Sequence, residues 1–208
     1  WLSRTGEDID VVQIHPGPIK PIMFRLGEVL EWLPNRTTQQ KRHSNKLLFR
    51  VESEIPPVQQ IRLKVEINCL EHFNVLGMQE VPFNMENGWF TGGTMLTTYH
   101  LEELVGTKVR ALYQRKKGRD LFDLYMALTT RELDIQKVLE CYRKYIEFVA
   151  DKAPSYKEFT QNMELKMQDE EFLEDVTPLL RPEIQFEPHA AYSLVHERLI
   201  DRMPGRRD

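Results

Sequence analysis

The most constraining feature of the sequence is a stretch of strict alternation between apolar and polar residues. Over residues 61–70 (IRLKVEINCL) the odd positions 61 to 69 are apolar, and the even positions 62 to 68 are polar. Because side chains in a β-strand alternate between two faces, this period of two predicts a strand with one buried and one polar face. Lys64 and Glu66 then lie on the polar face, so the chain needs a sheet whose other face packs on a core.

The remaining patterns divide the chain into a mixed part and a helical part. Strands are predicted at 7–14 and 45–53, and the apolar spacing of 22–33 predicts an amphipathic helix. Residues 80–98 resemble one or two strands around the hairpin dipeptide Asn87-Gly88. Helices are then expected at 101–115, 119–128, 131–150, 155–168, 169–180 and 188–201. The expected fold is α+β, with a mixed sheet and flanking helices in domain 1–98 and an all-helical domain at 99–208.

Composition excludes several classes of protein. The 208 residues carry 28 Lys and Arg against 32 Asp and Glu, a net charge of -4, so nucleic-acid binding would need a local basic patch. The chain lacks the run of roughly 18 apolar residues that a membrane span needs, so no membrane partner is expected. Two cysteines favour a reducing compartment such as the cytoplasm. Since the chain begins at Trp1 without Met, we expect natural sequence upstream of it.

Carboxylates on the predicted strands suggest a metal site. Asp8 and Asp10 are two residues apart and therefore share a face of their strand. If the strand of Glu66 lies beside them, three carboxylates converge, and their oxygens suit Mg²⁺ or Mn²⁺. Two such ions can stabilise the attacking and leaving oxygens of a phosphoryl transfer. The alternatives are a solvated acidic turn at Asp8 and Asp10 and a surface salt bridge between Lys64 and Glu66.

A basic run follows in the helical part. Residues 108–119 contain six Lys and Arg and no acidic residue, which makes a phosphate-binding patch plausible. Lys108 lies on the inward stripe of helix 101–115, with Arg115 one heptad further, so Lys108 either extends its amine to solvent or reaches an anion. Asp120 is placed to be the N-cap of the next helix, or else to act as a base or metal partner with Arg119 on a phosphate.

Three segments, taken in order, resemble the AbiEii/AbiGii-type nucleotidyltransferase family, which is related to minimal DNA polymerase beta-like transferases. The segments are RTGEDIDVV (4–12), IRLKVEINCLEHF (61–73) and TYHLEELVGTKVRALYQRKKGRDLFDLYMAL (98–128). The resemblance covers roughly residues 1–130. The sequence departs from the family pattern at two places. The Gly-rich or Gly-Ser segment that would precede Asp8 is absent, and Gly6 stands where the family often has Ser.

The resemblance implies a role for each residue that matches a family motif. Asp8 and Asp10 correspond to the metal-binding pair and Glu66 to the third carboxylate, with Lys64 in the second motif. Glu103 and Lys108 match the third motif, and Asp120 matches the fourth. The implied reaction moves a nucleotidyl group from a nucleoside triphosphate to an acceptor such as tRNA. We expect Lys64 and Lys108, with Arg115 and Arg119 of the basic run, to bind the nucleotide. Family members are usually toxins of bacterial toxin–antitoxin or phage-defence systems, which implies a cognate antitoxin.

Two other functions remain open from the residues alone. A degenerate transferase would act as an RNA- or protein-binding module, and the missing upstream segment favours this reading. A metal-dependent nuclease also uses convergent carboxylates with a lysine, although Lys64-x-Glu66 reverses the acidic-x-Lys order common in nucleases.

Overall fold

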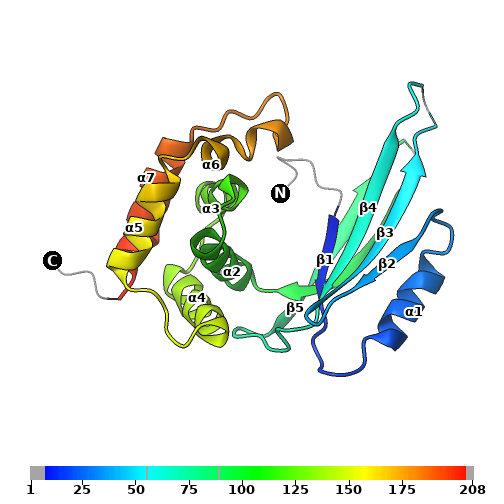
Figure 1. Cartoon of the computed structure of the whole chain (residues 1–208), viewed down its shortest axis with the longest axis horizontal. Helices are drawn as coiled ribbons and strands as arrows, with labels where there is room; N and C mark the ends of the chain where they lie inside the picture. Colours follow the sequence, from blue (N-terminus) through cyan, green and yellow to red (C-terminus); the bar gives the residue numbers. More distant parts are fainter. Residues whose placement is uncertain (1–7, 55, 89, 205–208) are drawn as a thin grey trace. The chain divides into compact units, whose positions relative to one another are not determined.

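The structure, a computed structural model, describes residues 8–54, 56–88 and 90–204 (Figure 1). Gly6 and the first residue of the predicted strand 7–14 therefore lie outside the described residues. The chain divides between residues 73 and 74 into two compact units, a sheet unit and a mainly helical unit. Within the described residues, none of the helices combines the length and the apolar content needed to cross a bilayer.

The sheet unit is built on four strands and one helix. The elements follow in the order β1 (Asp8–Val12), α1 (Lys20–Val29), β2 (Thr37–Gln40), β3 (Ser44–Glu52) and β4 (Gln60–Asn68). In space the strands are ordered β1-β4-β3-β2. Strand β1 runs parallel to β4, while the β4–β3 and β3–β2 pairs are antiparallel. The sheet is therefore mixed, as predicted.

One face of this sheet forms a small core. The alternating residues Leu47 and Phe49 of β3 and Val65 and Ile67 of β4 are buried there, and Met23 of α1 packs against them with Leu33. The period-two pattern of 61–70 thus marks a strand with one buried face, as predicted. The even-numbered residues of β4 point to the opposite face.

Strand β2 was not predicted from the sequence. Its residues Thr37–Gln40 are all polar and all exposed, so no alternation signals a strand. Backbone pairing with β3 holds it, from Thr37 opposite Leu48 to Gln40 opposite Asn45. The turn at 41–43 closes this hairpin, with the Lys41 N–H donating to the Ser44 carbonyl at 3.0 Å.

The second unit begins with a long hairpin. Strands β5 (Met78–Glu86) and β6 (Thr91–Tyr99) pair antiparallel from Met78 opposite Tyr99 to Glu86 opposite Thr91. The Asn87 N–H donates to the Phe90 carbonyl, and the Phe90 N–H donates to Asn87 Oδ1 at 2.9 Å. The hairpin prediction at Asn87-Gly88 is confirmed.

Helices make up the rest of this unit. They are α2 (Leu101–Gln114), α3 (Gly118–Thr130), α4 (Ile135–Val149), α5 (Tyr156–Lys166), α6 (Glu170–Glu174) and α7 (Pro188–Arg198), with short 3-10 turns at Thr177–Leu179 and Ile200–Arg202. Their shared core includes Leu112 and Leu124, which are fully buried, and Phe159 and Phe172. The predicted helices at 101–115, 119–128, 131–150, 155–168 and 188–201 are all present, with shifted ends.

A buried carboxylate fixes the start of the helical unit. Glu103 in the first turn of α2 is fully buried. It accepts hydrogen bonds from the N–H groups of Val75 and Leu76, at 2.8 and 2.9 Å, and from the Tyr145 hydroxyl of α4 at 2.8 Å. The segment before β5 is thereby tied to α2 and α4. This contact explains why the compact units divide near residue 73, whereas the patterns placed a boundary at about residue 98.

Two glycines permit close approaches in the helical unit. A Cβ on Gly106 of α2 would lie 2.7 Å from Cys141 Cβ and 2.8 Å from the Val138 carbonyl, both on α4. A Cβ on Gly118, the first residue of α3, would lie 2.0 Å from the Phe172 carbonyl oxygen. The backbone of the α6 segment therefore rests directly on the start of α3.

We expect Gly118→Ala to destabilise the protein by about 1–3 kcal/mol, because the added methyl overlaps a backbone carbonyl that cannot rotate away. Thermal unfolding followed by circular dichroism measures this effect. Gly88→Ala is the matched control, since nothing lies within 4 Å of its Cβ position. Equal melting temperatures for the two variants would contradict the close contact.

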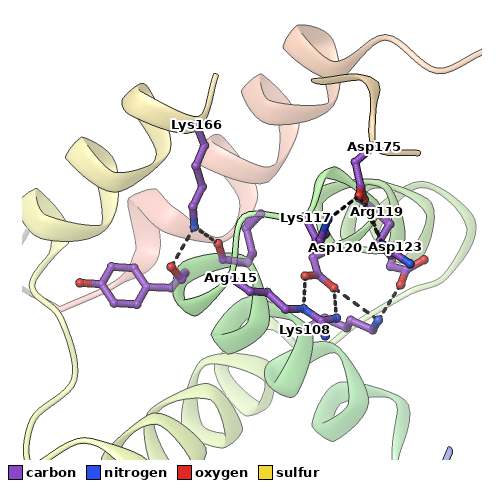
Figure 2. A network of polar contacts seen from close by, with 10 residues as sticks. Lys108, Arg115, Lys117, Arg119, Asp120, Asp123, Lys166 and Asp175 are labelled. Atoms are coloured by element: carbon purple, nitrogen blue, oxygen red, sulfur yellow. Dashed lines mark hydrogen bonds and ion pairs between the residues drawn. The ribbon is translucent and has the colours of Figure 1, made fainter. Parts of the chain in front are cut away.

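Lys166 at the end of α5 is a buried lysine held by backbone carbonyls (Figure 2). Its Nζ donates to the carbonyls of Leu112 and Tyr113, at 2.5 and 2.8 Å. These carbonyls belong to the last turn of α2, where helix geometry leaves acceptors unpaired. Burial lowers the pKa of Lys166 to about 8, and the charge of Asp120 opposes this shift only in part.

Because the pKa of Lys166 is lowered, the free energy of unfolding changes with pH in the alkaline range. Between about pH 8 and 10.5, the ordinary pKa of a lysine, the folded protein binds fewer protons at Lys166 than the unfolded chain does. The contribution of Lys166 to the free energy of unfolding therefore rises with pH across this window, as the cost of burying its charge is relieved. We expect the unfolding free energy of wild type, minus that of Lys166→Met, to increase from pH 8 to pH 10.

Urea unfolding at several pH values measures this difference. Lys144→Met, which removes an exposed lysine of α4, should differ from wild type by an amount that hardly changes with pH. A pH-independent offset for Lys166→Met would show that its ammonium is not desolvated.

Candidate active site

The pairing of β1 with β4 brings the predicted carboxylates to neighbouring strands. In this parallel register Asp8 lies opposite Lys64, and Asp10 lies opposite Glu66. Paired residues point to the same face of a sheet, and residues two apart on one strand also share that face. All four side chains therefore emerge from the polar face, opposite the core of Leu47 and Val65.

Ion pairs organise this group, which we call the carboxylate cluster: Asp8, Asp10, Lys64 and Glu66, with Lys46. Lys64 Nζ lies 2.8 Å from Asp8 Oδ2 and 3.0 Å from Glu66 Oε2. Lys46 Nζ of β3 lies 3.0 Å from the same Glu66 oxygen. The two ammonium groups thus offset the repulsion between carboxylates on adjacent strands.

Glu66 is fixed through both of its oxygens. Ser44 Oγ donates to Oε1 at 2.6 Å, while Oε2 faces the two lysines. Burial alone would raise the pKa of Glu66, but the hydrogen bonds from Ser44, Lys46 and Lys64 outweigh it and lower the pKa to about 2. Correspondingly, the hydrogen bond to Asp8 contributes most to raising the pKa of Lys64 above the ordinary value of a lysine. Glu66 is therefore ionised at any physiological pH.

The donor atoms of this cluster fit a divalent cation in their chemistry. Carboxylate oxygens are the ligands that Mg²⁺ and Mn²⁺ prefer. Across the described residues, however, no three His, Cys, Asp or Glu side chains are already grouped as a metal site. In the arrangement that the structure shows, Lys64 provides the positive charge between Asp8 and Glu66.

The second group of predicted residues lies at the junction of α2 and α3 (Figure 2). Asp120 is fully buried, and Arg115 binds both of its oxygens, with Nε–Oδ2 and Nη2–Oδ1 distances of 2.6 Å. Lys108 Nζ lies 2.7 Å from Asp123 Oδ2 and 3.5 Å from Asp120 Oδ1. Two carboxylates of α3 therefore hold the two predicted nucleotide-binding cations in fixed positions.

The predicted N-cap role of Asp120 is wrong. Helix α3 begins at Gly118, so Asp120 lies within its first turn and makes no side-chain cap. The carboxylate of Asp175 takes that place, because its Oδ2 accepts from the Arg119 N–H at 3.2 Å. The same carboxylate pairs with the Arg119 side chain, at 3.1 and 3.3 Å.

The basic run 108–119 is neutralised by acidic side chains. Besides the pairs of Lys108, Arg115 and Arg119, Lys117 lies 3.3 Å from Asp175, and Lys116 pairs with Asp169. The guanidinium of Arg110 lies over the Tyr145 ring, 5.4 Å from its centroid. The sequence run is therefore a network of ion pairs rather than an open cationic surface.

The predicted residues thus fall into two groups, each assembled within its own unit. Asp8, Asp10, Lys64 and Glu66 belong to the sheet unit, and the residues 108–120 belong to the helical unit. Sequence reasoning missed Ser44 and Lys46, which are two residues apart at the start of β3, Ser44 lying just before the predicted strand 45–53 and Lys46 within it. It also missed Asp175, which lies 56 residues beyond Arg119 and carries no local signal.

Comparisons with known proteins identify the family and the fold. Residues 2–193 match the family model described as "Nucleotidyl transferase AbiEii toxin, Type IV TA system". No curated protein sequence matches the chain significantly. A similar solved structure is MenT4, a nucleotidyltransferase toxin from Mycobacterium tuberculosis H37Rv, with a TM-score of 0.63 and 16% identity over 98% of this chain and 71% of that one. Because the family model spans most of its length, the chain belongs to the AbiEii nucleotidyltransferase toxin family.

Proposed function

We propose that the protein transfers a nucleotidyl group from a nucleoside triphosphate to an RNA acceptor such as tRNA, with Mg²⁺ or Mn²⁺. The observation that carries the proposal is the register of β1 and β4, which sets Asp10 opposite Glu66 in a chain of this family. The proposed setting is the bacterial cytoplasm, in a toxin–antitoxin or phage-defence system with a cognate antitoxin as partner.

In this proposal Asp8, Asp10 and Glu66 hold the metal ions. Bound divalent ions would supply charge stabilisation for the attacking and leaving oxygens of the transfer. Lys64 contacts Asp8 and Glu66 and therefore keeps the carboxylates together before metal binds. Its ammonium would then be available to a phosphate of the nucleotide.

The reaction itself requires one bond to form and one to break. The acceptor hydroxyl oxygen bonds to the α-phosphorus, the bond from that phosphorus to the pyrophosphate oxygen breaks, and pyrophosphate leaves. The hydroxyl proton goes to a carboxylate, for which we propose Glu66. Its pairing with Ser44 and Lys46 holds the side chain in place for this role.

The residues at the α2–α3 junction would neutralise the triphosphate. We propose that Lys108 and Arg115 bind its phosphates, together with Arg119. Asp120 is a positioning residue, because it reaches the substrate only through Arg115 and Lys108.

Label transfer tests the central claim. Incubating the protein with α-labelled nucleoside triphosphates, Mg²⁺ or Mn²⁺ and total tRNA should give labelled RNA on a denaturing gel. Asp10→Ala should abolish the signal, since losing a metal-binding carboxylate removes charge stabilisation of several kcal/mol. The control Asp151→Ala removes an exposed carboxylate of the helical unit and should leave transfer unchanged.

Equal label transfer by Asp10→Ala and wild type would contradict the metal-site assignment. Shortened RNA in place of labelled RNA would identify the competing nuclease activity. RNA binding without transfer or cleavage would identify a degenerate binding module.

Lys108→Met tests the nucleotide-binding role at the α2–α3 junction. Losing one charge-assisted contact of roughly 1.5–3 kcal/mol should raise the KM for the triphosphate by about 10- to 100-fold. Lys137→Met is the control, since it also removes a lysine paired with a carboxylate on a helix. An unchanged KM for Lys108→Met would exclude this lysine from the nucleotide site, provided that its melting temperature matches that of the control.

A further inference from the structure

The polar face of the sheet continues past the carboxylate cluster to a pair of arginines. In the antiparallel register of β3 and β4, Arg50 lies directly opposite Arg62. Arg62 is two residues from Lys64 on β4, so it shares the face of Lys64 and lies about 6–7 Å further along the strand. The arginine pair is therefore the neighbour of the cluster on the same surface.

The two like charges of Arg50 and Arg62 face each other, and Glu52, two residues past Arg50 on β3, forms no ion pair with either of them in the described part of the chain. Residues directly opposite on antiparallel strands have Cβ atoms about 4.5–5.5 Å apart, and like charges there are destabilising. Both arginines are exposed. Among the described residues, no carboxylate forms an ion pair with either guanidinium. The sheet thus carries a small electrostatic cost that an external anion would remove.

The surrounding segment extends this positive charge. Residues 32–51 contain no Asp or Glu in a chain with a net charge of -4, and they contain five basic residues: Arg36, Lys41, Arg42, Lys46 and Arg50. Lys41 and Arg42 are exposed in the turn before β3. The helical run 108–119 differs, because carboxylates of its own unit neutralise it.

The extent of the cationic residues favours a polymer as the partner. Arg50 lies six residues after Ser44, which is about 20 Å along a strand, and the turn with Lys41 and Arg42 lies beyond that. Lys46, opposite Glu66, lies between the two ends. A polyanion that follows β3 would meet cations on both sides of the carboxylate cluster.

We propose that Arg50 and Arg62 form a phosphate-binding subsite for the backbone of the RNA acceptor. Two guanidinium groups can hold a phosphate through paired N–H···O contacts, and the phosphate supplies the missing counter-charge. The subsite leads a single strand along the polar face toward Asp8 and Glu66. This inference rests on the proposed function for the identity of the polymer, but its test does not depend on catalysis.

The test measures RNA binding in the absence of triphosphate. Fluorescence anisotropy with a fluorescein-labelled single-stranded RNA oligonucleotide gives the Kd of the wild-type protein and of the Arg50→Gln/Arg62→Gln variant. We expect the variant to raise the Kd at least tenfold. The slope of log Kd against log salt, between about 50 and 200 mM, should fall by about 0.7, since the two arginines hold one phosphate and each phosphate neutralised on a single strand contributes about 0.7.

Two further measurements separate a binding role from an effect on folding or net charge. The melting temperature of the variant should equal or exceed that of wild type, because a repulsive pair has been removed. Arg131→Gln/Arg181→Gln removes two exposed arginines of the helical unit and should leave the Kd within about twofold of wild type, since neither residue belongs to the sheet face that carries the proposed subsite.

Three results would overturn the proposal. They are an unchanged Kd for Arg50→Gln/Arg62→Gln, an equal loss of binding in the Arg131/Arg181 control, and a loss of triphosphate affinity with RNA affinity intact. If RNA binding falls as expected while label transfer is absent in wild type, the proposed reaction fails and the RNA subsite stands.

Discussion

The lysine between two carboxylates is the interaction on which the candidate site depends. Strand β1 is an edge strand that buries little, since Ile9 and Val11 are 49% and 40% exposed. Apolar packing therefore contributes little to its register, and backbone pairing with β4 holds it. Lys64 adds an ion pair across this junction, to Asp8 on β1, while also contacting Glu66 on its own strand. Without that positive charge, the same register would place carboxylates side by side and weaken the strand pair that assembles the site.

The arginines of the two units differ in whether a carboxylate balances their charge. In the helical unit, the fully buried Asp120 is matched by Arg115, and Arg119 is matched by Asp175. Such pairs fix side chains, and removing one partner of a buried pair is costly. In the sheet unit, Arg50 and Arg62 face each other with like charge. A matched charge requires no external ligand, whereas an unmatched pair is stabilised by one.

Sequence periodicity predicted most of the elements but not their pairing. The alternation of 61–70 and the Asn87-Gly88 dipeptide predicted β4 and the β5–β6 hairpin, because both signals are local. The strand of Thr37–Gln40 has no apolar alternation and forms only because β3 offers its edge. The cap of α3 comes from Asp175, far along the chain, so local spacing pointed to Asp120 instead. The contacts of Ser44 and Lys46 with Glu66, and the Arg50–Arg62 pair, depend on the antiparallel register of β3 and β4, which local sequence patterns do not determine.

That register also orders the charges along one surface. Along β4, Glu66 lies opposite Lys46 of β3. Two residues before it, Lys64 lies opposite Asp8 of β1, and two residues before that, Arg62 lies opposite Arg50 of β3. A carboxylate attracts metal and repels phosphate, while an arginine does the reverse. A strand of RNA on this face would have its phosphates drawn to the arginines and kept from the carboxylates unless a divalent cation intervened. The sheet face itself would then make productive binding of the acceptor depend on metal, because only the metal-loaded cluster would accept the end of the strand.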